Sequence, residues 1–389
     1  MKKVLIIHAS AGDGHKRAAE ALNNAFMSSS EKDIEVTLID SLDYTNRFFS
    51  SCYRVGYIIL VKYLPTLWGF VYYLLDNRFF FNLNSPLRRL INALNTKRLK
   101  QFLVNERFDL ILATHFLGVE VISHLKKKGA LLSTLIAVLT DFKPHYYWQS
   151  EKVDIYTVAA EYTKAELIKR GVDEGKIRVT GIPLRKGFGA NLSKEEARKV
   201  SGLDPYKFTV LVMGGGFGVG PIEKTVLSLQ KLNFDCQIVA VCGHNSKLAH
   251  RLNALKTGFA KSTYIFGFYK NIDDIMAASD IMVTKVGGIT CAETLAEGLP
   301  VLTINPIPGQ EMHNAGFLFE NNIGFKLSRV DEVNGIVSVF FRSPGKLNEI
   351  SQDIHKLARP NAASDIVRLV IGTIYGPRTT PNQTEFSGI

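Results

Sequence analysis

The sequence predicts an α/β protein of two doubly wound domains, and three observations support this. A length of 389 residues exceeds one ordinary domain, while 46% hydrophobic and 21% charged residues give a globular balance. Short apolar runs alternate with amphipathic helical patterns along the chain, which is typical of βα units around parallel sheets. Glycine-rich turns follow strand-like runs in both halves, where an open α/β sheet binds its ligand.

The expected strands fall into two groups of five. Those of the first half are Val4–His8, Ile34–Ile39, Leu110–Ala113, Thr134–Leu139 and Ile155–Ala159. Those of the second half are Thr209–Met213, Gln237–Val241, Tyr264–Phe266, Ile281–Val283 and Val301–Ile304. Residues 181–187 (GIPLRKG) combine turn formers without periodicity and predict a domain boundary. We therefore expect an N-terminal domain over 1–182, a C-terminal domain over 183–359, and a terminal helix with a polar tail over 360–389.

Composition restricts the possible partners and the compartment. Lys and Arg outnumber Asp and Glu by 47 to 36, a net charge of +11, and residues 78–107 alone hold seven basic residues against one acid, Glu106. A cationic surface attracts nucleic acid, anionic lipid or phosphorylated substrates alike. The four cysteines are scattered without a CxxC pair, which argues against a disulfide scaffold or a structural zinc site. Together with a start that does not resemble a signal peptide, this predicts a cytoplasmic protein.

One aromatic tract does not fit a soluble domain of this kind. Residues 55–75 (VGYIILVKYLPTLWGFVYYLL) carry a single charge, Lys62, and include Trp68 and Tyr72. Pro65 and Lys62 lie near the middle, and the aromatic residues are not confined to the two ends as in a spanning helix. We expect the tract to lie on or dip into a bilayer. A core helix and a spanning helix are the alternatives.

The residues that follow the tract predict an amphipathic helix over Pro86–Val104. Leu87, Leu90, Ile91, Leu94 and Phe102 share one helical side, whereas Arg88, Arg89, Lys97, Arg98 and Lys100 lie largely elsewhere. Such a helix is suited to rest among anionic headgroups. The basic residues would otherwise form an ordinary solvated face. A nucleic-acid surface is disfavoured, since the basic window adjoins a lipid-like tract and no recognised module.

The first glycine loop, Ser10–Ala19 (SAGDGHKRAA), follows a strand and opens a helix. Its helix N-terminal amides are open toward an anion or a polar ligand. It is not a dinucleotide fingerprint, because Arg17 stands at the third glycine position, and no P-loop lysine follows. His15 lies at the helix mouth, where an imidazole could serve as a general base for an acceptor hydroxyl. A capping histidine is the alternative.

The second half contains three further loops of this kind, each between a strand and a helix. Residues 213–220 (MGGGFGVG) allow backbone to approach a ligand at Gly215 and Gly216. In residues 284–300, the amides of Gly288, Ile289 and Thr290 would meet a pyrophosphate, and the Glu293 carboxylate could accept both ribose hydroxyls. The turn NPIPGQE (305–311) delivers Gln310 and Glu311, which suit sugar hydroxyls. The three loops favour a nucleotide sugar over ordinary helix capping.

These segments resemble the monogalactosyldiacylglycerol synthases and the bacterial processive diacylglycerol glycosyltransferases, relatives of the peptidoglycan GlcNAc transferase among the family 28 glycosyltransferases. The similarity covers nearly the whole chain. It is carried by SAGDGHKRAAEAL (10–22), LTDFKPHYYW (139–148), the loop 213–220, VTKVGGITCAETLAEGLPVL (283–302) and NPIPGQEMHNA (305–315). The resemblance implies a GT-B fold, with two facing Rossmann-like domains and a cleft between them. The first would hold the lipid acceptor and the second the UDP-sugar, with the terminal helix returning to the first.

The resemblance also implies roles for single residues. His15 matches the catalytic histidine, and Asp141 could orient a base, touch the acceptor or merely cap its loop. Glu293 matches the ribose-binding acid, and Gln310 and Glu311 match the pair that contacts donor hydroxyls. Further donor positions are Gly288, Ile289, Thr290, Asn245 and Phe268, with Phe268 placed where backbone meets uracil. His145 and Trp148 complete the 139–148 segment on the acceptor side.

The predicted activity is inverting transfer of a hexose from a UDP-sugar to the hydroxyl of diacylglycerol. It would take place at the cytosolic face of the membrane, on an anionic surface. No D-x-D motif occurs, so we expect no bound metal or other cofactor, with amides and helix dipoles stabilising the diphosphate. The sequence does not distinguish between glucose and galactose as the transferred hexose. The alternatives are a GT-B transferase with another lipid acceptor, and a peripheral membrane protein that senses nucleotide sugars without catalysis.

Overall fold

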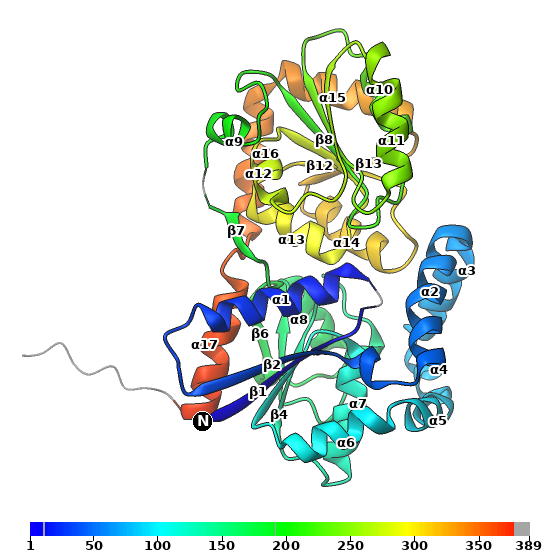
Figure 1. Cartoon of the computed structure of the whole chain (residues 1–389), viewed down its shortest axis with the longest axis vertical. Helices are drawn as coiled ribbons and strands as arrows, with labels where there is room; N and C mark the ends of the chain where they lie inside the picture. The colour runs from blue at the N-terminus through cyan, green and yellow to red at the C-terminus, as the bar shows by residue number, and fades with distance from the viewer. Residues whose placement is uncertain (11, 191, 377–389) are drawn as a thin grey trace, which may run out of the picture.

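The computed structural model describes residues 1–10, 12–190 and 192–376. Two α/β domains are stacked along the long axis of the molecule (Figure 1). Each is built on a six-stranded sheet whose strands all pair in parallel. The predicted doubly wound architecture is therefore confirmed. The polar tail expected at 377–389 lies outside the described residues.

The first sheet has the strand order β2-β1-β3-β4-β5-β6. Its strands are β1 (Lys2–His8), β2 (Ile34–Asp40), β3 (Leu110–Ala113), β4 (Thr134–Val138), β5 (Ile155–Val158) and β6 (Ile177–Val179). Its helices are α1 (Asp13–Met27), α6 (Lys97–Glu106), α7 (Phe116–Lys127) and α8 (Glu161–Lys169). The strand order reverses between β1 and β3, and the loops that follow strands at such a reversal are the usual ligand-binding position of an open α/β sheet.

The second sheet has the order β10-β9-β8-β11-β12-β13. Its strands are β8 (Thr209–Met213), β9 (Gln237–Val241), β10 (Ser262–Phe266), β11 (Ile281–Thr284), β12 (Val301–Ile304) and β13 (Gly324–Leu327). Its helices are α9 (Lys194–Val200), α10 (Ile222–Leu229), α11 (Ser246–Leu255), α12 (Ile272–Ala277), α13 (Gly288–Ala296), α14 (Gln310–Glu320), α15 (Val333–Arg342) and α16 (Pro344–Leu357). The order reverses between β8 and β11, which places the loops 213–220 and 284–288 side by side.

Three strands were not predicted from the sequence. β6 and β13 are short edge strands with partly exposed residues, so they lack the apolar run that marks a central strand. β7 (Lys186–Gly189) starts in the turn-rich segment 181–187 and contacts α12 and α13 of the second domain. It forms the first connection between the two domains in Figure 1.

The segment between β2 and β3 forms four additional helices: α2 (Arg47–Tyr63), α3 (Pro65–Leu75), α4 (Arg78–Leu83) and α5 (Ser85–Asn95). They stand at one side of the first domain (Figure 1). The aromatic tract is divided at Leu64, where Pro65 begins a new helix. Among the described residues no helix alone has the length and hydropathy to cross a membrane; Arg47–Val61 and Pro65–Leu75 reach them only together, across a bend of 115°.

The single amphipathic helix expected over Pro86–Val104 is wrong. The chain breaks at Thr96, which is fully buried and whose hydroxyl donates to the Asn92 carbonyl at 2.6 Å. α5 keeps Leu87, Leu90, Ile91 and Leu94 exposed, as predicted. α6 instead buries Leu99 and Leu103 in the core of the first domain.

The last helix, α17 (Ala362–Tyr375), returns to the first domain (Figure 1). It packs on α1, and its buried residues Ile366, Val367 and Val370 join a core that includes Val4 and Ile6 of β1. The chain therefore passes between the domains twice, which ties them together at two places.

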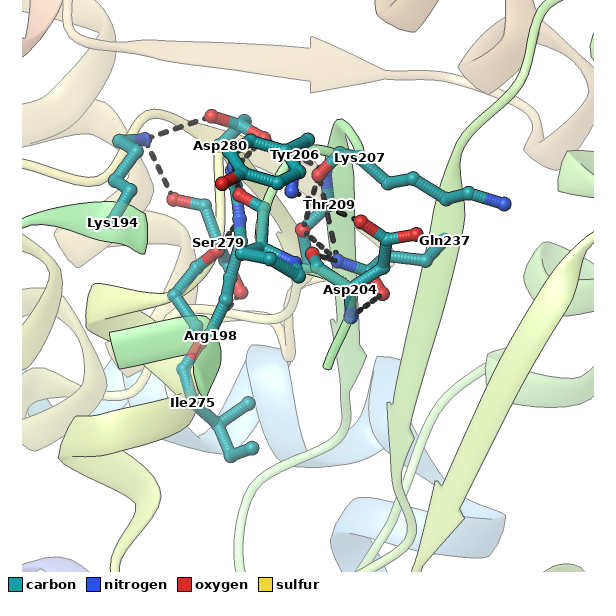
Figure 2. Close-up of polar contacts among 12 residues, drawn as sticks. Lys194, Arg198, Asp204, Tyr206, Lys207, Thr209, Gln237, Ile275, Ser279 and Asp280 are labelled. Atoms are coloured by element: carbon teal, nitrogen blue, oxygen red, sulfur yellow. Dashed lines mark hydrogen bonds and ion pairs between the residues drawn. The ribbon is translucent and has the colours of Figure 1, made fainter. Parts of the chain in front are cut away.

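A buried polar network joins α9 to the amino ends of β8 and β11, opposite the carboxyl ends that meet the first domain (Figure 2). The Asp280 carboxylate accepts hydrogen bonds from Arg198 (Nη2, 2.6 Å), Lys194 (Nζ, 3.2 Å) and the backbone N–H of Thr209 (2.7 Å). Gln237, fully buried, donates to the Asp204 carbonyl at 2.8 Å. Because the network lies away from the domain junction, its role is structural.

Candidate active site at the domain junction

The loops that follow the inner strands of both sheets meet at the junction of the two domains. α1 of the first domain faces α13 and α14 of the second (Figure 1). The junction is closely packed: a side chain at Gly288 would overlap the Thr140 carbonyl, and one at Gly216 would overlap the Asp13 carboxylate. The glycines at these two positions therefore permit the close approach of the domains.

His15, in the first turn of α1, is held by the loops that follow β3 and β4. Its Nδ1 lies 2.6 Å from the Thr114 carbonyl oxygen and 2.9 Å from the Thr140 hydroxyl oxygen. A carbonyl oxygen can only accept a hydrogen bond, so Nδ1 carries the hydrogen. The lone pair then resides on Nε2, which is the form that a general base requires.

The surroundings of His15 favour the neutral imidazole. Burial lowers the pKa of His15, and the Asp141 charge and the Thr114 carbonyl only partly oppose this shift. The buried His115 ring packs edge-on against His15, with centroids 4.5 Å apart. Trp148, also buried, lies 6.4 Å from His15 between ring centroids. His15 is thus ready to accept a proton near neutral pH.

Asp141 connects the first domain with α14 of the second. Gln310 donates its amide N–H groups to both carboxylate oxygens at 2.8 Å, and Asn314 donates to Oδ1 at 3.1 Å. Burial raises the pKa of Asp141, while His15 and the two amides favour the charged carboxylate and oppose the rise. The sequence suggested Asp141 and Gln310 separately; the structure joins them directly.

Glu293, in α13, lies at the domain junction and is fully buried. One carboxylate oxygen is paired with Arg17 of α1, and the other, Oε2, has no partner among the described residues. Burial raises the pKa of Glu293, and Arg17 and Arg185 oppose the rise. Gly288, Ile289 and Thr290 form the first turn of α13, so their N–H groups are available to an anion.

Both carboxylate oxygens of Glu311 have partners within the second domain. Its Oε1 pairs with Lys285 at 2.7 Å, and its Oε2 accepts the Ile307 N–H at 2.8 Å. These bonds fix the turn before α14 and thereby position Gln310. Contact of Glu311 with donor hydroxyls stays a prediction, since both oxygens would have to be shared or exchanged.

The second glycine loop lies beside a cavity of about 450 Å³ lined by residues of the loop, α10 and α11, Asn245 among them. Asn245 caps α11 through the Leu248 N–H at 3.1 Å, and its amide donates to the Gly218 carbonyl at 3.3 Å. Gly215 has a positive φ of 68° within the turn. Phe268 is 62% exposed and stacks on His244 with ring centroids 4.5 Å apart.

The residues predicted for the acceptor and the membrane are divided between several environments. Tyr72 packs against His145 (4.7 Å between centroids) and reaches His313 of α14 (5.8 Å). Trp68 is half-buried on α3. Arg89 is exposed, but Arg88 is not available to headgroups, because it pairs with Glu120 at 2.7 Å and lies over the Phe81 ring. Trp148 is 2% exposed and belongs to the surroundings of His15.

Sequence reasoning missed several residues of the junction. Thr114 acts through its backbone carbonyl, which no sequence pattern reveals. Asn314 lies four residues after Gln310 and therefore on the same face of α14, a spacing that could have identified it. Within residues 1–10, 12–190 and 192–376, no group of three or more His, Cys, Asp or Glu side chains is arranged to hold a metal ion.

Comparison with known proteins places this site in a family. Residues 15–184 match the family model described as monogalactosyldiacylglycerol (MGDG) synthase, and residues 209–332 match the glycosyltransferase family 28 C-terminal domain. The chain is 31% identical to the chloroplastic monogalactosyldiacylglycerol synthase of Spinacia oleracea, over 94% of this chain and 71% of the relative. The chain belongs to the monogalactosyldiacylglycerol synthase family.

Bacterial members of this family are similar over nearly their whole length. The processive diacylglycerol beta-glucosyltransferase of Staphylococcus aureus is 30% identical, over 95% of this chain and 93% of the relative. That of Bacillus licheniformis is 29% identical, over 95% and 94%. The two family models, over residues 15–184 and 209–332, cover the positions of His15 and α14.

Solved structures confirm the GT-B fold. MurG of Acinetobacter baumannii superposes with a TM-score of 0.63 at 15% identity, covering 95% of this chain and 99% of MurG. The UDP-bound MnaA of S. aureus gives 0.61 at 15% identity, covering 99% and 100%. At this identity the likeness concerns the fold alone, and the chemistry must be argued from the site.

Proposed function

We propose that this protein transfers a hexose from a UDP-sugar to the free hydroxyl of diacylglycerol, with inversion at the sugar C1. The observation that carries the proposal is the hydrogen bond from His15 Nδ1 to the Thr114 carbonyl, which leaves Nε2 as a base at the domain junction. The family relationship supports the acceptor, since its members are named as diacylglycerol beta-glucosyltransferases and monogalactosyldiacylglycerol synthases.

The reaction is a single displacement. His15 Nε2 takes the proton of the acceptor hydroxyl while its oxygen bonds to C1, and the bond from C1 to the diphosphate oxygen breaks on the opposite face. N–H groups in the first turn of α13, which have no partner within the helix, stabilise the negative charge on the leaving diphosphate. Only one base and one stabilised leaving group are needed for inversion.

Donor binding requires a rearrangement at Glu293. For the ribose hydroxyls to donate to this carboxylate, Arg17 must leave it, and the unpartnered Oε2 is ready to accept the second hydroxyl. Gln310 presents its amide nitrogen to Asp141, so its amide oxygen faces away from that carboxylate and suits a hexose hydroxyl. Glucose and galactose both have hydroxyls that could donate a hydrogen bond to this amide oxygen.

We propose that α2–α5 attach the protein to the cytosolic face of an anionic membrane. The apolar residues that these helices expose include Val55, Ile59, Leu67, Phe70, Phe79, Leu83, Leu87, Leu90 and Leu94. An exposed apolar surface of this extent is unusual for a soluble protein that acts alone. Exposed Arg78, Arg89, Lys97 and Arg98 lie along the same part of the chain and favour anionic headgroups.

The deciding experiment incubates purified protein with vesicles that contain diacylglycerol and either UDP-glucose or UDP-galactose. A β-linked hexosyl-diacylglycerol is expected with one donor, and analysis of the lipids shows how many sugars are added. Vesicles that carry a different hydroxylated lipid are the matched control. UDP binding without any glycolipid product would instead support a non-catalytic sensor, and a product only on the control lipid would change the acceptor.

A further inference from the structure

Asn314 joins the two domains through both ends of its side chain. It lies on α14 and is fully buried. Its Oδ1 accepts the backbone N–H of Phe142 at 2.9 Å, and its Nδ2 donates to Asp141 Oδ1 at 3.1 Å. Both partners belong to the loop that follows β4 in the first domain.

The orientation of this amide is forced by its partners. A backbone N–H can only donate, so the atom that faces Phe142 is the oxygen. The nitrogen therefore points at Asp141, whose carboxylate accepts. With Gln310 on the same face of α14, Asn314 supplies the second amide that holds the carboxylate.

Asp141 acts on His15 through its charge, which raises the pKa of His15 against the effect of burial. Thr140, the residue before Asp141, lies within hydrogen-bonding distance of His15 Nδ1, at 2.9 Å. The position of this loop therefore affects both the charge near His15 and the hydrogen bonding of its ring. Gln310 is expected to contact the donor hexose, so it cannot be assigned to Asp141 alone, whereas both ends of Asn314 are directed to the loop.

We propose that Asn314 is a positioning residue for the transfer reaction: it holds the loop of Asp141 and Thr140 in place against His15 when the two domains are closed. The base would then be fully arranged only in the closed molecule, which restricts catalysis to the state that excludes water. This inference rests on the proposed function.

A double-mutant cycle tests whether Asn314 acts through Asp141. Asn314→Ala is expected to lower kcat about 10- to 100-fold with the KM for the UDP-sugar changed by less than about threefold, since misplacement of catalytic groups mainly affects the chemical step. In an Asp141→Asn background the same substitution is expected to lower kcat by less than about threefold further. An undiminished effect in that background, or a raised KM with unchanged kcat, would overturn the proposal.

A pH profile gives a second measurement that a merely structural role would not change. Without the Asn314 amide, the charged form of Asp141 is less stabilised, its pKa rises, and its influence on His15 weakens. The acid limb of kcat/KM should therefore move to lower pH in Asn314→Ala. Glu311, Cys291 and Tyr72 also face Asp141 and are the same in every variant. An unmoved limb would contradict the proposal.

Two further variants separate positioning from packing. Asn314→Asp has the same shape and can still accept the Phe142 N–H, but it presents an oxygen to Asp141, so activity should fall at least as far as in Asn314→Ala. Asn321→Ala, at the exposed residue that follows α14, removes a comparable amide that donates to the Phe317 carbonyl at 2.8 Å, and should keep wild-type kinetics. Thermal midpoints identify variants that fail to fold. If the wild-type protein forms no glycolipid product, the proposed function is refuted instead.

Discussion

At the scale of single residues, the site depends on a histidine whose proton is fixed by a backbone carbonyl. In many hydrolases a carboxylate orients the catalytic imidazole; here the Thr114 carbonyl orients His15, the proposed base, and Asp141 contributes charge from nearby. A carbonyl oxygen cannot be protonated at ordinary pH, so the tautomer of His15 should persist over a wide pH range.

Replacement of His15 by alanine is expected to lower kcat about 10²- to 10⁴-fold, the usual contribution of a general base. UDP affinity should change little, because the groups assigned to the nucleotide belong to the second domain. Steady-state kinetics with diacylglycerol vesicles, together with UDP titration, measure the two effects. A His15→Ala variant that folds and retains near-normal turnover would remove His15 from this role.

The pH dependence follows from the direction of the His15 shift. The base is active when deprotonated, and burial holds the pKa of His15 below its ordinary 6.5. Activity should therefore persist between pH 7 and 8 and fall only as the pH drops through a value below 6.5. The measurement is kcat/KM across pH 5–8; an acid limb centred above 6.5 would show that another group, or a charged imidazole, controls the rate.

In the proposed donor site Arg17 would compete with the ribose for Glu293, so its removal should strengthen UDP binding. Arg17→Ala leaves the Glu293 carboxylate free for ribose, whereas Glu293→Ala removes it. We expect the UDP Kd to fall about threefold or more in the first variant and to rise at least about tenfold in the second, by calorimetry. The exposed Lys16→Ala is the control. Weaker UDP binding by Arg17→Ala would mean that Arg17 contacts the donor instead of blocking it.

At the scale of elements, the exposed apolar helices α2–α5 should determine membrane affinity. Leu90→Asp on α5 places a charge on a residue that is 56% exposed, and is expected to reduce partitioning onto anionic vesicles about tenfold or more. Val339→Asp on α15, where the valine is 51% exposed, is the matched control and should bind as the wild type does. Vesicle sedimentation measures both, and equal binding by the two variants would exclude α5 from the contact.

The buried ion pair that fixes α9 should matter for stability and not for catalysis. Asp280→Ala leaves Arg198 buried without its charged partner, which typically costs about 3–5 kcal/mol of unfolding free energy. The surface pair of Asp353 and Lys356 is well exposed, so Asp353→Ala should cost less than about 1 kcal/mol. Urea unfolding compares the two. A similar loss in both variants would show that the network in Figure 2 contributes little.

At the scale of the whole molecule, the domains are connected by β7 and by the chain between α16 and α17. Glu297, at the end of α13, accepts the Gly189 N–H of β7 at 2.8 Å. Burial raises the pKa of Glu297 to about 7. The link between the domains therefore contains a carboxyl group that titrates in the physiological range.

Glu297 should make stability depend on pH. The folded protein holds the proton more tightly than the unfolded chain, so the stability that this group contributes is complete below about pH 4.5 and is lost as the pH rises toward 7. Glu297→Gln should therefore raise the thermal midpoint by a few degrees at pH 8 and by much less at pH 5. The exposed Glu320→Gln is the control. A midpoint gain that is equal at both pH values would contradict the shifted pKa.

Much of the fold could be predicted because its pattern is local. Central strands such as β1 and β8 are continuous apolar runs, and the glycine turns that follow them mark the carboxyl ends of parallel strands. Edge strands β6 and β13 could not be predicted, because their partly exposed residues do not form a continuous apolar run. The break at Thr96 was missed because a hydroxyl bonded to its own helix leaves no periodic signal.

The candidate site could be predicted only in part, and the reason is physical. The sequence by itself determined two parallel sheets, the glycine turns at their carboxyl ends, and which residue types, His15, Glu293 and Gln310 among them, stand there, since each of these depends on neighbours a few positions away. The tertiary structure alone decided that Asp141 meets Gln310 and Asn314, that Arg17 occupies Glu293, and that Arg88 turns inward to Glu120. Those contacts join residues that are 32 to 276 positions apart. Their geometry depends on how the domains and the helices pack, which local pattern does not specify.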